Sequence, residues 1–191
     1  MPNLINSPKI AIIGAKSGLL GSELGLSSAD LESADAALFL VSAGDGIVSA
    51  DLAKWRIARE LYIPSLVVIC DLLDNEIDFE DMSAIASKML DPVVTPFLVL
   101  HSDDGKPAAL INLETLRILD YTTGSVAERK ADPEHVELVA EFREEYIEAI
   151  EDAGEDSFVA GLLFPALPWI EGTRMGIEQI LLYLDQVPAS S

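Results

Sequence analysis

Lys16 and Ser17 are the residues whose types could contact a phosphate group, because they follow Gly14 at the end of a short apolar run. A Walker A loop needs the order Gly-x4-Gly-Lys-(Ser/Thr). Its backbone amides surround the phosphates, its lysine neutralises them and its hydroxyl holds Mg²⁺. Here only Ala15 separates Gly14 from Lys16. The spacing therefore predicts a turn that is too short to surround a phosphate.

The other candidates for catalysis or metal binding are isolated from one another. His101 stands beside a turn and His135 near a helix start, and neither has a patterned partner, so we expect both at the surface. The acidic segments 102–105 and 151–156 lack the Asp-x-Asp-x-Asp-Gly-x5-Glu order of an EF-hand, which favours ordinary acidic turns. The sequence predicts no catalytic residue and no metal site.

The composition is that of an acidic chain with enough apolar residues for a full core. Of its 191 residues, 50% are hydrophobic, and 12 basic against 33 acidic residues give a formal net charge of -21. Such a field repels nucleic acids and anionic membranes, so we expect a protein partner with a basic surface instead. The single cysteine, Cys70, excludes an intrachain disulfide. With no apolar span of ~20 residues, we expect a cytoplasmic protein.

Trp169 is the residue that we expect to take part in protein contacts. It follows Pro168 in a proline-rich loop, whereas Trp55 has the spacing of a core helix. Exposed aromatic side chains are enriched at protein interfaces. We therefore expect Trp169 to be exposed.

Hydrophobic periodicity predicts alternating strands and helices over much of the chain. The expected strands are 9–14, 36–41, 66–70 and 162–167, and the expected helices are 28–34, 51–62, 78–90 and 173–184. This alternation is typical of an α/β fold with a doubly wound, mostly parallel sheet flanked by helices.

Residues 93–131 follow a different pattern. Apolar runs at 93–100 and 108–112 flank an Asp-Asp-Gly turn, which predicts a hairpin, and the polar residues 122–131 predict a loop. Asp132 and Pro133 then begin a long acidic helix. We expect a single domain, residues 1–191, with an inserted hairpin-plus-helix subdomain at residues 103–156.

The order of these elements resembles the GTPase domain of elongation factor G, and especially its shorter G-like relatives, over residues 9–188. Three segments carry the resemblance: residues 34–46, residues 66–75, and the passage from Phe164-Pro165-Ala166 to Gly176 and the last helix. That family also inserts a strand and an acidic helix, which residues 108–113 and 132–152 match. The resemblance implies a P-loop GTPase-like fold.

The resemblance also implies where a nucleotide would bind. The family's guanine-reading motif, Asn-Lys-x-Asp, falls on residues 71–74, where Asp71 replaces the asparagine, Leu72 replaces the lysine and Asp74 alone matches. Asp74 could accept a hydrogen bond from guanine or cap the turn before the next helix. Asp71, Asp74, Lys16 and Ser17 are thus vestigial nucleotide-binding candidates. The strand interval from residue 10 to residue 36 fits the family's third and fourth strands, so we expect an N-terminally truncated domain without the phosphate loop.

Three functions are compatible with these expectations. The first is a catalytically inactive pseudo-GTPase that needs no cofactor. It would act as a protein interaction or assembly module, on a basic partner or by self-association through an uncovered sheet edge. The alternative is a GTP-binding, elongation factor-like GTPase that uses GTP and Mg²⁺ at a non-standard site. A small-molecule pocket in the vacated crevice is a third option.

Overall fold

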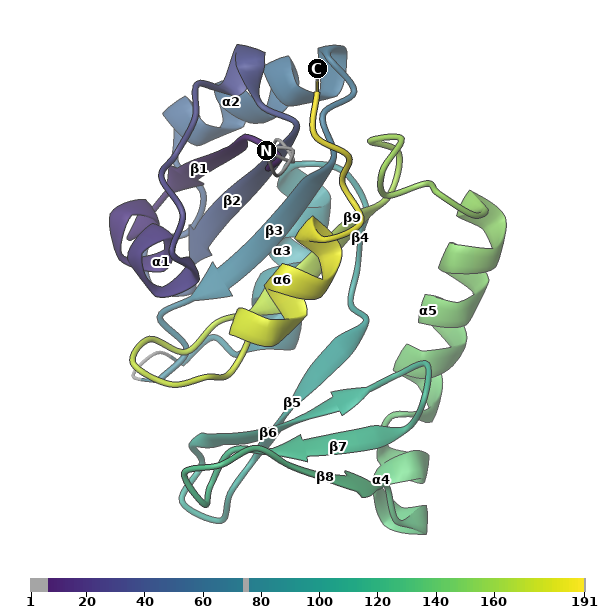
Figure 1. Ribbon diagram of the computed structural model, residues 1–191. Helices are drawn as coiled ribbons and strands as arrows, with labels where there is room; N and C mark the ends of the chain where they lie inside the picture. The colour runs from purple at the N-terminus through teal and green to yellow at the C-terminus, as the bar shows by residue number, and fades with distance from the viewer. Residues whose placement is uncertain (1–6, 74–75, 191) are drawn as a thin grey trace, which may run out of the picture.

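A parallel sheet forms the centre of one of the two units of the molecule, and a second sheet forms the other (Figure 1). The computed structural model describes residues 7–73 and 76–190. Within them the sheet strands are β1 (Ile10–Gly14), β2 (Ala36–Ser42), β3 (Ser65–Cys70), β9 (Phe164–Pro168) and β4 (Val93–Val94), in the order β1-β2-β3-β9-β4. Each neighbouring pair is parallel. The expected α/β fold with a mostly parallel sheet is confirmed.

The central strands β2 and β3 are buried along their whole length. Phe39, Val67 and Ile69 are at most 3% exposed. Near-continuous apolar runs of this kind suit strands that are covered on both faces. Because the strands are parallel, the turns that follow β1, β2, β3 and β9 meet at one edge of the sheet, where α/β folds place their ligands.

Helices cover both faces of this sheet. They are α1 (Ser17–Leu24), α2 (Ser49–Glu60), α3 (Phe79–Met89) and α6 (Ile177–Leu184), with a 3₁₀ turn η1 (Leu31–Ser33) before β2. In Figure 1, α6 lies in front of the sheet and α3 behind it. Trp55 of α2 packs edge-to-face on Phe39 and Phe164, with ring centroids 5.0 and 5.2 Å apart. Among the described residues, no helix is long and apolar enough to cross a membrane.

The first helix lies earlier in the chain than expected. The prediction of a helix at residues 28–34 is wrong: α1 occupies Ser17–Leu24, and only the short turn η1 falls in the later segment. Two glycines in α1 hid it, because glycine disfavours helices. A Cβ on Gly21 would lie 3.0 Å from the Leu26 carbonyl oxygen and 3.3 Å from Ile12 Cδ1. This glycine therefore lets α1 pack closely against β1.

The inserted unit is a sheet of its own rather than a hairpin. Its antiparallel strands are β5 (Phe97–His101), β6 (Pro107–Asn112), β7 (Arg117–Asp120) and β8 (Ala127–Lys130), followed by α4 (Pro133–Leu138) and α5 (Ala140–Ala153). The unit begins with β5, before residue 103, because β5 pairs with β6. Strand β8 lies where a loop was expected. Its four residues are all exposed, so the sequence has no alternation of apolar and polar residues that would predict a strand there. The long acidic helix is interrupted at Val139, which is buried.

The outer edge of β1 is covered by the chain itself. The amide of Ile12 donates to Ser28 Oγ at 2.9 Å, and the amide of Ala29 donates to the carbonyl of Ile10 at 2.8 Å. An unpaired strand edge is a template for pairing with another chain. The uncovered sheet edge that the sequence led us to expect is therefore closed at these positions.

Candidate functional site

The turn between β1 and α1 holds the first two predicted site residues. β1 ends at Gly14, Lys16 has a left-handed backbone (φ 56°), and α1 begins at Ser17. A Cβ on Gly14 would lie 2.3 Å from the Leu40 carbonyl oxygen, so the strand can end here only with glycine. The arrangement of strand, turn and helix is the one in which Walker A loops occur. The connection, however, is four residues shorter than such a loop requires.

Lys16 is held by two carboxylates at the strand-end edge. Its Nζ donates hydrogen bonds to Asp71 Oδ1, just after β3, and to Glu171 Oε1, in the loop after β9. These two hydrogen bonds raise the pKa of Lys16 above its ordinary value, and the bond to Asp71 contributes more than the bond to Glu171. The ammonium therefore stays charged, with both carboxylates directed at it.

Asp71 is anchored from a second side by β2. Ser42, at the end of β2 and 1% exposed, donates its hydroxyl to Asp71 Oδ2 at 2.6 Å. Burial would raise the pKa of Asp71, but the hydrogen bonds from Lys16 and Ser42 outweigh it and hold the pKa below its ordinary value. The amides of Gly44 and Asp45 donate to the same Ser42 oxygen at 3.2 and 3.1 Å. Turns after three strands are thus connected through one carboxylate.

These residues line a small crevice of about 270 Å³. We call it the strand-end crevice; its lining is Lys16, Asp71, Leu72, Leu73, Trp169, Ile170 and Glu171. Ser17 lies instead in a neighbouring hollow of about 450 Å³, together with Asp45, Asp51 and Lys54. Asp74 lies outside the described residues. Of the four predicted nucleotide-binding residues, the structure brings together Lys16 and Asp71.

The expectation of an exposed Trp169 is wrong. Its side chain is fully buried directly after β9, and its Nε1 donates to Glu23 Oε2 at 3.0 Å. The other Glu23 oxygen accepts from the amide of Gly172 at 3.1 Å. Trp169 therefore connects α1 to the loop after β9 and cannot act as a surface anchor. Proline neighbours suggested a loop at the surface, but Pro168 belongs to the buried strand β9.

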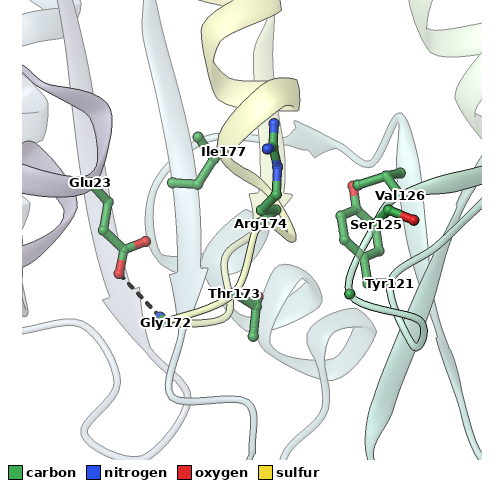
Figure 2. A pocket seen from close by; sticks show the side chains of 9 residues that line it. Glu23, Tyr121, Ser125, Val126, Gly172, Thr173, Arg174 and Ile177 are labelled. Atoms are coloured by element: carbon green, nitrogen blue, oxygen red, sulfur yellow. Dashed lines mark hydrogen bonds between the residues drawn. The ribbon is translucent and has the colours of Figure 1, made fainter.

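A larger cavity is lined in part by Gly172, Thr173 and Arg174 of the loop after β9 (Figure 2). Its volume is about 720 Å³. Figure 2 shows Glu23 and Ile177 on one side and, on the other, Tyr121, Ser125 and Val126 of the turn between β7 and β8. The Nη2 atom of Arg174 donates to Glu178 at 2.6 Å. The cavity therefore lies between the parallel sheet unit and the turn between β7 and β8.

Comparison with known proteins gives a consistent picture. No family model matches the chain. Elongation factor G-like proteins from Mycobacterium tuberculosis strains CDC 1551 / Oshkosh and H37Rv are each 29% identical over 177 residues, covering 80% of this chain and 24% of the relative. The crystal structure of ttk003000868 from Thermus thermophilus superposes with a TM-score of 0.72 and 27% identity, over 83% of this chain and 27% of that one. The resemblance to elongation factor G-like proteins is confirmed. The chain spans about a quarter of the length of these relatives.

The chemistry available at the strand-end crevice is limited. Cys70, beside the crevice, is buried, and burial raises the pKa of its thiol to about 12. It therefore stays protonated and is a poor nucleophile. Among the described residues, no group of three His, Cys, Asp or Glu side chains could hold a metal ion. What the crevice does offer is hydrogen bonding between its own charged side chains.

Two residues of this region were not predicted from the sequence. Glu171 and Glu23 are single acids in a chain with 33 of them, and no spacing connects them to Lys16 or Trp169. The fold reveals their roles, because it brings residue 171 beside residue 16 and residue 23 beside residue 169. A signal for Glu171 did exist: it follows the last parallel strand, whose end must lie at the ligand edge.

Proposed function

We propose that this chain is a pseudo-GTPase: an elongation factor G-like domain that does not use GTP and that acts through protein contacts. The observation that carries the proposal is the pairing of Lys16 with Asp71 and Glu171. In a working phosphate loop the lysine neutralises the phosphates. Here the ammonium of Lys16 instead pairs with two carboxylates of its own chain.

The electrostatics of the strand-end crevice support this proposal. A phosphate near Lys16 would have to displace Asp71 or Glu171, and the displaced carboxylate would then repel it at short range. Lys16 is the basic residue in the crevice lining, beside two acids. The formal charge of -21 adds a repulsive field at longer range.

The same charge favours a basic partner over a second copy of the chain. Two copies that each carry -21 repel one another, and the outer edge of β1 is already covered. A protein with a basic surface would instead be attracted by this field. The proposed role is therefore a nucleotide-independent contact with a basic protein, and nucleic acids and anionic membranes are disfavoured as partners.

Phosphate release tests the catalytic half of the proposal. With GTP and Mg²⁺, we expect the purified protein to release phosphate no faster than buffer alone. A rate that scales with protein concentration and survives further purification would contradict it, and Lys16→Ala would then show whether the crevice is responsible.

Salt and nucleotide dependence test the interaction half. The immobilised chain should retain a basic protein from cell extract at low ionic strength and release it as salt rises, because screening removes the attraction. GTP and GDP should leave the retained amount unchanged. Retention that requires GTP and Mg²⁺ would favour the alternative of an active GTPase.

A further inference from the structure

A groove of about 350 Å³ lies between α3, the segment that joins β4 to β5, and α5. It shares no lining residue with the strand-end crevice or with the cavity beside Arg174. Two separate units contribute to it, because α3 belongs to the parallel sheet unit and α5 follows the inserted sheet. Its volume lies in the range of small-molecule sites.

One part of the groove is apolar. Leu98 of β5 is 4% exposed, and Val93 of β4 is half-buried. Phe142 of α5 lines the same groove and leaves 42% of its surface in solvent. An exposed aromatic ring beside an apolar surface gives a hydrocarbon chain a place to be buried, and its π face attracts a cation.

The charged lining is mostly acidic. Glu80 comes from α3 and Glu145 from α5, while Lys88 is the basic residue of the lining and is exposed. Glu80 Oε1 accepts from the amide of Val99 at 3.3 Å. Burial, together with nearby Asp78 and Asp81, raises the pKa of Glu80. A cation in the groove would therefore offset an unfavourable carboxylate charge.

The hydroxyl of Ser83 is an independent indication that the groove binds a polar group. Ser83 lines the groove and is 3% exposed, yet its Oγ has no hydrogen-bond partner among the described residues. Buried hydroxyls are nearly always hydrogen-bonded, and an unpaired one costs free energy. A ligand that carries a hydrogen-bond donor would satisfy it.

From these features we propose that the groove between α3 and α5 binds a linear aliphatic amine. One ammonium group pairs with Glu80 and Glu145 and reaches the hydroxyl of Ser83. The methylene chain packs on Leu98 and Phe142. This site goes beyond the proposed interaction role and stands whether or not the strand-end crevice binds a nucleotide.

The test is a titration of the ¹⁵N-labelled protein with cadaverine, followed by two-dimensional NMR. We expect saturable shifts of amides in α3 and α5, with a Kd on the order of 1 mM. MgCl₂ carries the same charge without a carbon chain, so it serves as the charge control. We expect magnesium to shift these amides much less at equal concentration.

Matched variants separate the groove from the general negative field. Glu145→Gln should weaken cadaverine binding about threefold, as for an exposed ion pair. Glu80→Gln should weaken it about tenfold, because its charge is more buried. Glu144→Gln removes the same charge from the neighbouring position of α5, which does not line the groove, and should leave the Kd unchanged. No saturation, equal binding of magnesium, or equal loss in all three variants would overturn the proposal.

Discussion

Lys16 is the residue whose contacts most restrict what the strand-end crevice can bind. Its ammonium lies between Asp71 and Glu171, and Asp71 is fixed in turn by the buried hydroxyl of Ser42. A lysine that is free to meet a phosphate would lack such partners. A lysine at position 16 could bind a phosphate by its residue type. Its neighbours instead pair it with two carboxylates of the protein itself.

Lys16→Ala should lower the free energy of unfolding by about 1 kcal/mol at pH 7, since the side chain is partly exposed. The folded-state pKa of Asp71 lies below its ordinary value of 3.8. The ionised Asp71 carboxylate therefore contributes to the free energy of unfolding above pH 3.8. This contribution is lost as the pH falls through the folded-state pKa of Asp71. Urea unfolding at pH 7 and near pH 3 checks this: the difference in the free energy of unfolding between wild type and variant should be smaller near pH 3. Lys106→Ala, which removes a more exposed pair with Asp104, is the control and should cost little at either pH.

Glu23→Ala should destabilise the protein by about 1–3 kcal/mol, because the indole N–H of buried Trp169 and the amide of Gly172 both lose their acceptor. Glu23→Gln keeps an acceptor oxygen and should recover much of that loss. Chemical unfolding of the two variants checks the prediction. Equal stability of Glu23→Ala and wild type would show that the buried N–H has another acceptor.

At the scale of elements, the sequence predicted the strands better than the insertions. Strands β2 and β3 were found because both are uninterrupted apolar runs. Helix α1 was missed because glycine hides a helix. Strand β8 was missed because pairing with β7 alone defines it: Arg117 faces Lys130, and the side chains of Arg117 and Glu128 lie 3.4 Å apart. Backbone pairing leaves little trace in a sequence of exposed polar residues.

The loop between β9 and α6 depends on Gly176. Its φ is 94°, and a Cβ there would lie 2.0 Å from the Pro168 carbonyl oxygen. Gly176→Ala should therefore cost at least about 3 kcal/mol or prevent folding. Gly18→Ala in α1 meets nothing within 4 Å and should instead stabilise by about 0.5–1 kcal/mol. Thermal and urea unfolding of both variants give the comparison, and a well-folded Gly176→Ala protein would contradict the loop structure.

At the scale of the whole molecule, the chain combines a complete core with a strongly acidic composition. The parallel sheet is covered by helices, and the outer edge of β1 is occupied by residues 28–29. The fold class could be predicted because strand and helix periodicities alternate along the chain. The partners of Lys16 could not, because they depend on contacts between residues 55 and 155 positions apart. The proposed function is argued from the charge of the chain and from the strand-end crevice rather than from any motif.

The most direct test of the pseudo-GTPase account is an equilibrium titration of the purified protein with fluorescent GDP and GTP, with and without Mg²⁺. For a pseudo-GTPase we expect no saturable binding up to about 1 mM, the dissociation constant at which the binding free energy falls to about 4 kcal/mol. Saturable binding that GTP but not ATP competes away, and that Asp71→Ala or Asp74→Ala abolishes, would contradict it.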